Sequence, residues 1–132
     1  MGKLQNKVAI VTGATSGIGR GILEVFVEEG AKVVFCGRRE ELGISIEADL
    51  RSKGYDVKYV KADMTRDEDV KNLFDVAIAA YGKLDILVND AGMLKMSPLT
   101  DMDVEKDWDA VFRLNLRSYF VATQHAARLM GT

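Results

Sequence analysis

The sequence of 132 residues has one cysteine, one histidine, one tryptophan and one proline. It therefore offers few side chains for disulfide, thiol or histidine chemistry. A single cysteine excludes an internal disulfide. Cys36 follows the apolar residues VVF, which favours a small buried side chain over a redox role. We therefore expect a fold held together by its hydrophobic core, since a chain of this size buries roughly two thirds of its unfolded surface.

The sequence also lacks a strong charge of one sign and any long apolar run. Its net charge is −2, from 18 Lys and Arg against 20 Asp and Glu, which argues against a dedicated nucleic-acid surface. No stretch has the ~20 apolar residues of a membrane-spanning helix, and the first residues, MGKLQNK, contain no apolar signal-peptide core. We therefore expect a cytoplasmic protein with no nucleic-acid and no membrane partner, and we assign no metal ligands.

One pattern is present three times: a short run rich in β-branched residues, then a stretch with helical spacing, then a glycine. The runs predict strands, and the glycines predict the ends of the helices that follow them. The predicted strands are residues 8–11, 32–36 and 57–60, and the glycines are Gly30, Gly54 and Gly82. The alternation indicates an α/β fold.

Two of the predicted helices carry distinctive residues. The second, over residues 40–53, contains Gly43, which is expected to weaken it because glycine is a poor helix former. The third is expected to open with a capping box, in which Thr65 and Glu68 each bond the other residue's main-chain N–H.

A fourth apolar run, at residues 84–88, is interrupted only by Asp85 and predicts a central parallel strand buried on both faces. Four such strands predict a Rossmann-type, doubly wound parallel sheet. Right-handed crossovers favour the strand order 3-2-1-4. No linker or low-complexity tract divides the chain, so residues 1–132 are expected to form one domain.

The segment TGATSGIG, residues 12–19, lies between the first predicted strand and the first predicted helix. Gly13 can take the backbone angles of a tight turn, Gly17 lets the main chain approach a pyrophosphate, and Gly19 lets the helix lie close to the strand. Free N–H groups of the first helical turn then face the phosphates. The spacing predicts a nucleotide-phosphate site, and the plain alternative is an ordinary glycine-rich turn.

Three further segments follow predicted strands: residues 37–39, 63–64 and 89–92. The carboxyl ends of parallel strands meet at one edge of a sheet, so these segments and the glycine-rich turn are expected to converge there. Ligand chemistry is therefore predicted at this edge.

Four collinear motifs resemble the classical short-chain dehydrogenase/reductase family: TGATSGIG, Asp63 in ADMT, NDAG at residues 89–92, and Asn115 in LNL. Asn115 lies in a helix expected over residues 105–130, which begins with Glu105 and ends with Met130. The resemblance covers the whole chain and corresponds to the N-terminal, cofactor-binding half of the family. It implies a nicotinamide dinucleotide as cofactor.

The resemblance places cofactor contacts in the glycine-rich turn and at the ends of the strands. The residues are Gly13, Thr15, Ser16, Gly17, Ile18, Gly19, Arg38, Arg39, Asp63, Met64, Asn89, Ala91 and Gly92. In the family, the carboxylate at Asp63 accepts a hydrogen bond from the adenine amino group, and Ala91 and Gly92 pass under the ribose. Asp90 departs from the family's usual asparagine. The plain alternatives are a capping residue at Asp63 and a simple turn in NDAG.

The cofactor is expected to be NADP(H) rather than NAD(H). In the family, an acidic residue at the end of the second strand selects NAD, whereas this sequence has Gly37, Arg38 and Arg39 there. No carboxylate repels a 2′-phosphate, and a guanidinium can pair with it. Both arginines could instead be solvated at the start of a helix, and Ser16 stands where NADP-preferring relatives often have a basic residue.

Asn115 is the one member of the family's catalytic set that the resemblance places in this chain, where its main chain would hold a water of the proton relay. The alternative is that Asn115 is simply a polar side chain on a packed helix. No tyrosine is followed by lysine four residues later, so the catalytic Ser, Tyr and Lys have no counterpart. Tyr119 and His125 are interpreted as structural or interfacial. We expect the cofactor-binding portion of an oxidoreductase for alcohols or ketones, inactive alone.

Two other functions stay open. One is a non-catalytic module that binds a nucleotide and acts by assembly. The other is a methyltransferase, which Arg38 and NDAG argue against because such enzymes usually need an acidic ribose ligand at that place. The helix over residues 105–130 and an open sheet edge are expected to expose apolar surface, so we predict a homo-oligomer formed through one of them.

Overall fold

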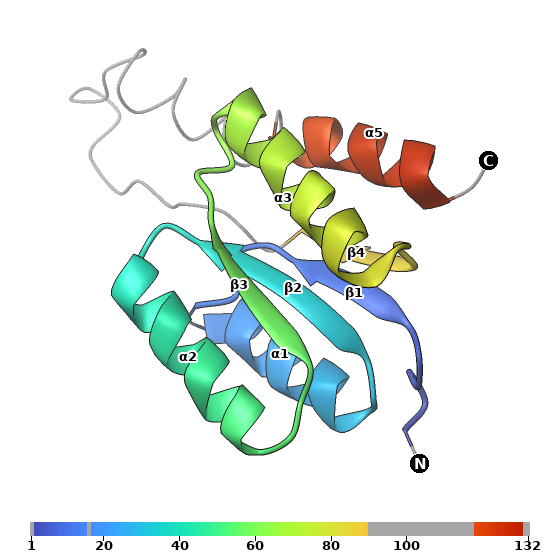
Figure 1. Cartoon of the computed structure of the whole chain (residues 1–132). Helices are drawn as coiled ribbons and strands as arrows, with labels where there is room; N and C mark the ends of the chain where they lie inside the picture. The colour runs from blue at the N-terminus through green and yellow to red at the C-terminus, as the bar shows by residue number, and fades with distance from the viewer. Residues whose placement is uncertain (1, 16, 90–117, 131–132) are drawn as a thin grey trace.

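The computed structural model describes residues 2–15, 17–89 and 118–130, and the statements below concern those residues. Four parallel strands form one sheet in the order β3-β2-β1-β4, with helices on both faces (Figure 1). The elements are β1 (Val8–Val11), α1 (Gly17–Glu28), β2 (Lys32–Gly37), α2 (Glu40–Ser52), β3 (Val57–Lys61), α3 (Asp67–Tyr81), β4 (Ile86–Val88) and α5 (Ser118–Met130). The doubly wound fold and the strand order 3-2-1-4 are confirmed.

The two faces of the sheet form two separate cores, because side chains alternate along each strand. Ala9, Val33 and Phe35 face α1 and α2, whereas Ile10 and Val34 face α3 and α5. All of these side chains are buried. The fourth strand was expected to be central and buried on both faces, and this is wrong for the described residues: Ile86, Leu87 and Val88 are half-buried, because β4 pairs there with β1 alone. No helix in the described part of the chain has the length and apolar content needed to cross a bilayer.

The ends of the elements differ little from the prediction. β1 has the expected bounds, and β2 and β3 each extend one residue further, to Gly37 and Lys61. The glycines expected to end three helices, Gly30, Gly54 and Gly82, all have a left-handed φ, at 94°, 89° and 78°. α5 matches the last half of the helix expected over residues 105–130, and residues 105–117 lie outside the described residues.

The fourth strand begins at Ile86, two residues later than expected, and Asp85 just before it is bonded to β1. Its carboxylate Oδ2 accepts the main-chain N–H of Val8 at 2.9 Å, and its own N–H donates to the Val8 carbonyl at 2.9 Å. The bond from Val8 lowers the pKa of the Asp85 carboxyl and outweighs the opposite effect of partial burial, with Lys83 at 3.1 Å acting in the same direction. The polar residue in an apolar run therefore joins β1 to β4 at their amino ends.

The capping box expected at the third helix is wrong. α3 begins at Asp67, and its N-cap, Arg66, makes no side-chain capping bond. The Thr65 hydroxyl instead donates to Oδ1 of Asp63 at 2.6 Å. Thr65 therefore bonds within the loop before the helix, a local alternative to capping that threonine side chains commonly take.

Gly43, which was expected only to weaken the second helix, has a role in packing. It is buried in α2, and a Cβ at this position would overlap the ring of Tyr59 on β3. That ring lies tilted against Phe35, with the centroids 5.4 Å apart, and its hydroxyl donates to the carbonyl of Gly37 at 2.6 Å. The missing side chain therefore lets α2 and Tyr59 approach closely and brings Tyr59 to the carboxyl end of β2.

Replacing Gly43 by alanine is expected to lower the free energy of unfolding by about 1 to 3 kcal/mol, because overpacking outweighs the gain in helix propensity of ~1 kcal/mol. The matched control is Gly21→Ala in α1, where a Cβ would meet nothing within 4 Å. This control is expected to raise stability by roughly 0.5 to 1 kcal/mol. Urea unfolding followed by circular dichroism measures both, and a stabilised Gly43→Ala protein would contradict the packing role.

Candidate nucleotide-binding site

The glycine-rich turn is held from both sides by the neighbouring strands. The N–H of Thr12 donates to the Val88 carbonyl on β4 at 3.0 Å, and the N–H of Ala14 donates to the Cys36 carbonyl on β2 at 3.1 Å. The side chain of Thr12 is fully buried, with its hydroxyl 3.4 Å from the same Val88 oxygen. These bonds place the turn across the carboxyl ends of three strands, as the strand order predicted.

The start of α1 is open to a ligand in shape and in charge. Gly13 and Gly17 have φ values of 66° and 62°, in the left-handed region that glycine tolerates. A Cβ at Gly17 would meet nothing within 4 Å, and the first turn of α1 contains no acidic residue to neutralise its positive end. Ile18 is 76% exposed and Gly19 is buried. The turn can therefore bind an anionic group through main-chain N–H groups.

Gly37, at the end of β2, has a role that sequence reasoning missed. A Cβ at this position would lie 2.6 Å from Cγ2 of Thr15, whose side chain is 7% exposed. Thr15 belongs to the glycine-rich turn, so the turn occupies the space that a side chain at residue 37 would need. A side chain at residue 37 would have to displace that of Thr15, and the first side chain after β2 that reaches the edge is that of Arg38.

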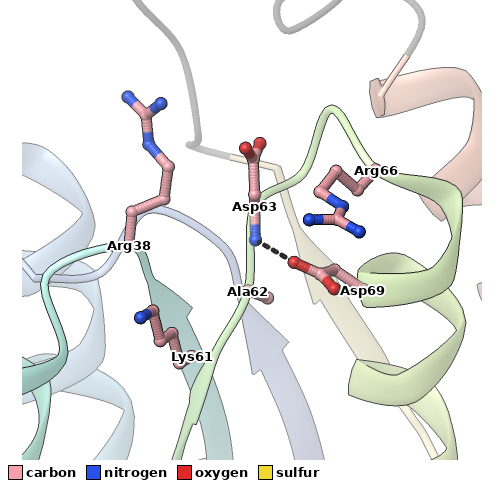
Figure 2. Close-up of a pocket in the computed structure, with 6 residues that line it drawn as sticks. All are labelled: Arg38, Lys61, Ala62, Asp63, Arg66 and Asp69. Atoms are coloured by element: carbon pink, nitrogen blue, oxygen red, sulfur yellow. Dashed lines mark hydrogen bonds between the residues drawn. The ribbon is translucent and has the colours of Figure 1, made fainter.

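A cavity of about 410 Å³ opens beside β2 and β3, at their carboxyl ends. Figure 2 shows the carboxylate of Asp63 between the side chains of Arg38 and Arg66. The lining residues are Arg38, Lys61, Ala62, Asp63, Arg66 and Asp69. The structure therefore brings together Arg38 and Asp63, which the sequence analysis had assigned to one site. Arg39 does not line the cavity; it is the exposed N-cap of α2.

Lys61, Arg66 and Asp69 were missed by the sequence analysis. All three lie within six residues of Asp63, in the stretch KADMTRDED. Their charge and their nearness to Asp63 in the sequence could have identified them as candidates for the same site. Their side chains reach the cavity because β3 ends and α3 begins on either side of Asp63. The cavity thus has three cationic and two anionic side chains, which suits a ligand that carries negative charge and polar hydrogen-bond donors.

The carboxylate of Asp63 is held in place by its neighbours. Its Oδ1 accepts the hydroxyl of Thr65 at 2.6 Å and the N–H of Thr65 at 2.9 Å. Partial burial raises the pKa of this carboxyl, but the two bonds from Thr65, helped by the positive charges of Arg38 and Arg66, outweigh it, so the pKa lies below its usual value. Asp63 is therefore ionised at neutral pH and is a hydrogen-bond acceptor only.

Met64 and Cys36 lie beneath the cavity and face the core. The side chain of Met64 is 5% exposed, and its sulfur is 3.9 Å from Sγ of Cys36. Met64 can thus offer a ligand its main chain but not its thioether. Burial raises the pKa of the Cys36 thiol to about 12, which agrees with the expectation of a buried, non-redox cysteine.

Asn89 lies at the end of β4 and joins it to α5. Its Nδ2 donates to the hydroxyl of Thr123 at 3.4 Å, and its buried Oδ1 has no hydrogen-bond partner among the described residues. Ser16, Ala91, Gly92 and Asn115 lie outside the described residues, so their assignments stay predictions.

Of Tyr119 and His125 on the long helix, the structure describes the side chain of His125 only. His125 stacks on Phe74 of α3, with the ring centroids 5.5 Å apart and the planes at 22°, which supports its structural interpretation. Tyr119 lies in α5, and its side chain is outside the described part. Within the described residues, no three His, Cys, Asp or Glu side chains are grouped to hold a metal ion.

Comparisons with known proteins agree with the fold and with the motifs. The family model for short chain dehydrogenases matches residues 7–132. An uncharacterized oxidoreductase of Thermotoga maritima is 37% identical over 96% of this chain, and tropinone reductase-like 1 of Erythroxylum coca is 39% identical over 97%. The matched regions make up 49% and 47% of those proteins. The chain thus spans about half the length of the curated relatives it matches.

Solved structures of short-chain dehydrogenases also match this chain over about half of their own length. A short chain dehydrogenase of Burkholderia cenocepacia, in complex with NADP, is 35% identical and superimposes with a TM-score of 0.92 over 98% of this chain and 53% of its own. A double mutant of a short-chain dehydrogenase/reductase of Serratia marcescens is also 35% identical, with a TM-score of 0.91 over 97% and 52% of the two chains. The same fold therefore occurs in about half of each of these longer chains.

The thiol of Cys36 is expected to be inert in the folded protein, because it is fully buried and its pKa of about 12 leaves almost no thiolate at pH 8. Titration with a chromogenic disulfide reagent measures this. We expect no reaction over minutes under native conditions and one equivalent in 8 M urea, as required by the one cysteine of the sequence. Rapid reaction of the native protein would show that this core opens readily.

Proposed function

Because the chain belongs to the short-chain dehydrogenase/reductase family, we propose that it is the dinucleotide-binding domain of an oxidoreductase and that it binds NADP(H) in preference to NAD(H). The observation that carries this proposal is the cavity in which Arg38 and Asp63 lie together. It is on the edge of the sheet where the glycine-rich turn also lies, so one extended ligand can reach both.

The preference for NADP(H) follows from the end of β2. Residue 37 is a glycine, with Thr15 packed beside it, so β2 ends without a carboxylate that could bond the ribose hydroxyls or repel a 2′-phosphate. Arg38 is the next residue, and its guanidinium can form two parallel hydrogen bonds with a phosphate. Lys61 and Arg66 add positive charge on the same cavity. The related dehydrogenase of Burkholderia cenocepacia was solved with NADP, which supports this choice.

The remaining contacts are assigned along the sheet edge. The pyrophosphate lies at the open start of α1, over Gly17, where main-chain N–H groups and the helix dipole stabilise it. The adenine amino group bonds Asp63, and the main chain of Met64 lies alongside. Asn89 contributes its buried Oδ1, which has no hydrogen-bond donor in the part of the chain that the structure describes. Ala91 and Gly92 pass under the ribose, by resemblance to the family.

We propose that the chain of 132 residues does not transfer hydride by itself. It contains no tyrosine followed by lysine four residues later, and it spans about half the length of its relatives. Of the family's catalytic set only Asn115 has a counterpart here. The domain holds the cofactor, and the groups that would orient a carbonyl substrate and move its proton are absent from these residues.

Titration with NADPH and NADH, followed by reduced-cofactor fluorescence, tests the binding. Arg38→Gln is expected to weaken NADPH binding at least about tenfold and to change NADH binding by less than about twofold, because only NADPH has the 2′-phosphate. The matched control is Arg39→Gln, which removes the same charge from the adjacent residue, outside the cavity lining. It is expected to change NADPH binding less than about twofold.

Two results would contradict this assignment. Failure of the unaltered chain to bind either cofactor would contradict the proposed function as a whole. Equal effects of Arg38→Gln and Arg39→Gln would mean that general charge, and not a contact at Arg38, determines the preference. NADPH consumption with any member of a panel of ketones and aldehydes would contradict the proposal that the chain is inactive alone.

We also propose a homo-oligomer formed through α5 or through the free edge of the sheet. Ala122 and Ala126 of α5 are buried against α3, whereas Phe120, Leu129 and Met130 are exposed, Phe120 by 64%. In the described part of the chain, β4 pairs only with β1. Such surfaces favour association. A cytoplasmic location belongs to the same proposal, on the composition of the sequence.

Sedimentation velocity at micromolar concentration is expected to show a species of at least twice the chain's 14.6 kDa. Phe120→Glu is expected to shift the distribution toward monomer, because it puts a charge on the exposed face of α5. Val25→Glu, at a residue of α1 that is 55% exposed, is the matched control and is expected to leave the distribution unchanged. A stable monomer of the unaltered chain would contradict the oligomer.

A further inference from the structure

Thr65 and Asp69 contact Asp63 but have no assigned part in binding. We propose that they are positioning residues, which hold the Asp63 carboxylate so that the site accepts adenine and rejects hypoxanthine at the end of the dinucleotide. This inference rests on the proposed function, since it concerns how the same cavity recognises the base. It assigns the two residues a role in selectivity and not in chemistry.

The two oxygens of Asp63 have different environments. Oδ1 accepts both donors of Thr65, the hydroxyl at 2.6 Å and the N–H at 2.9 Å. Oδ2 has no hydrogen-bond donor among the described residues. Figure 2 shows the carboxylate pointing away from Asp69, into the space between Arg38 and Arg66. One oxygen therefore holds the group in position, and the other is available to a ligand.

The main chain of Asp63 is held as well. Its N–H donates to Oδ2 of Asp69 at 2.8 Å, and its carbonyl accepts the N–H of Arg66 at 3.0 Å. Asp69 is in the first turn of α3, so the bond ties the loop to a helix that is itself packed on the core. Just before it, the N–H of Ala62 donates to the Gly37 carbonyl at 3.3 Å. The main chain is thus held to β2 at Ala62 and to α3 at Asp63.

The constraint matters because Asp63 lies between two arginines. Without the hydroxyl of Thr65, the carboxylate has one fewer bond on Oδ1 and can turn toward Arg38 or Arg66 to form an ion pair. In that orientation it no longer presents a free oxygen to the base. The bonds from Thr65 therefore keep the carboxylate directed into the cavity although opposite charges lie on both sides.

A directed carboxylate distinguishes adenine from hypoxanthine, which differ at C6 and at the neighbouring N1. At C6, adenine has an amino group, which donates a hydrogen bond, whereas hypoxanthine has a carbonyl oxygen, which only accepts; at N1, hypoxanthine carries a proton that adenine lacks. An ionised carboxylate cannot donate, so in the position that adenine takes the oxygen of hypoxanthine meets a like partial charge. The N1 proton of hypoxanthine reaches Asp63 only if the base or the carboxylate moves, which a carboxylate held in place resists. A site built to bond one such group rejects the analogue strongly. If the carboxylate is free to turn away, adenine loses its hydrogen bond to Asp63 and hypoxanthine no longer meets the repulsion. The difference in affinity between the two bases then decreases.

The test measures the ratio of the dissociation constants for NADPH and for its hypoxanthine analogue. The unaltered chain is expected to prefer NADPH at least about tenfold. Thr65→Val, which keeps the shape and removes the hydroxyl, is expected to reduce the preference to within about threefold, whereas Thr65→Ser restores it. Asp69→Ala is expected to reduce it in the same way, and Asp69→Asn, which keeps an acceptor for the Asp63 N–H, retains it within about twofold of the unaltered value.

The ratio separates a positioning role from a structural one. A turn that only stabilises the fold would lower the urea midpoint of Thr65→Val and leave the base preference unchanged, and this result would overturn the inference. Loss of the preference in Thr65→Ser would also overturn it. If the unaltered chain binds neither nucleotide, the proposed function fails, and the inference fails with it. Binding of NADPH with an unchanged ratio in all four variants contradicts the inference alone.

Discussion

The hydrogen bonding of β1 to both of its neighbours is the interaction on which the rest of the structure depends. β1 pairs with β2 on one side and with β4 on the other. The N–H of Val8, its first residue, bonds Asp85 before β4, and the N–H groups of Thr12 and Ala14, beyond its last residue, bond β4 and β2. Because β1 is central, the turn that follows it must cross the carboxyl ends of the sheet. The start of α1 and the ends of β2 and β3 then lie at one edge, which is a condition for any shared ligand.

Close packing at two glycines links this edge to the body of the domain. Gly43 admits the ring of Tyr59, whose hydroxyl bonds the carbonyl of Gly37, and the missing side chain of Gly37 admits Thr15 of the glycine-rich turn. The position of α2 is thereby connected to the position of the turn through direct contacts. A side chain at either glycine would displace a neighbour that has few alternative positions, because the interior is densely packed.

The fold was predictable because its signals are local and repeated. Apolar runs, glycines after helices and the βα alternation each depend on a few neighbouring residues, and right-handed crossovers leave few possible strand orders. The prediction failed where two local options compete. Thr65 has the right spacing for a capping box with Glu68, yet its hydroxyl donates to Asp63, and sequence spacing does not say which partner the side chain takes. In the same way, the sequence identifies Gly43 only as a poor helix former. Its role in packing depends on the ring of Tyr59, which lies on another element.

The sequence by itself determined the family, the strand order and the assignment of Arg38 and Asp63 to one site, because collinear motifs and the alternation of elements are properties of the chain's order. The tertiary structure alone decided which charges surround Asp63, which of the two adjacent arginines lines the cavity, and why residue 37 is a glycine. Those facts depend on distances between side chains of different elements, such as Thr15 and Gly37 or Asp63 and Asp69. Such distances are set by how the strands and helices pack, and no pattern within one segment specifies them.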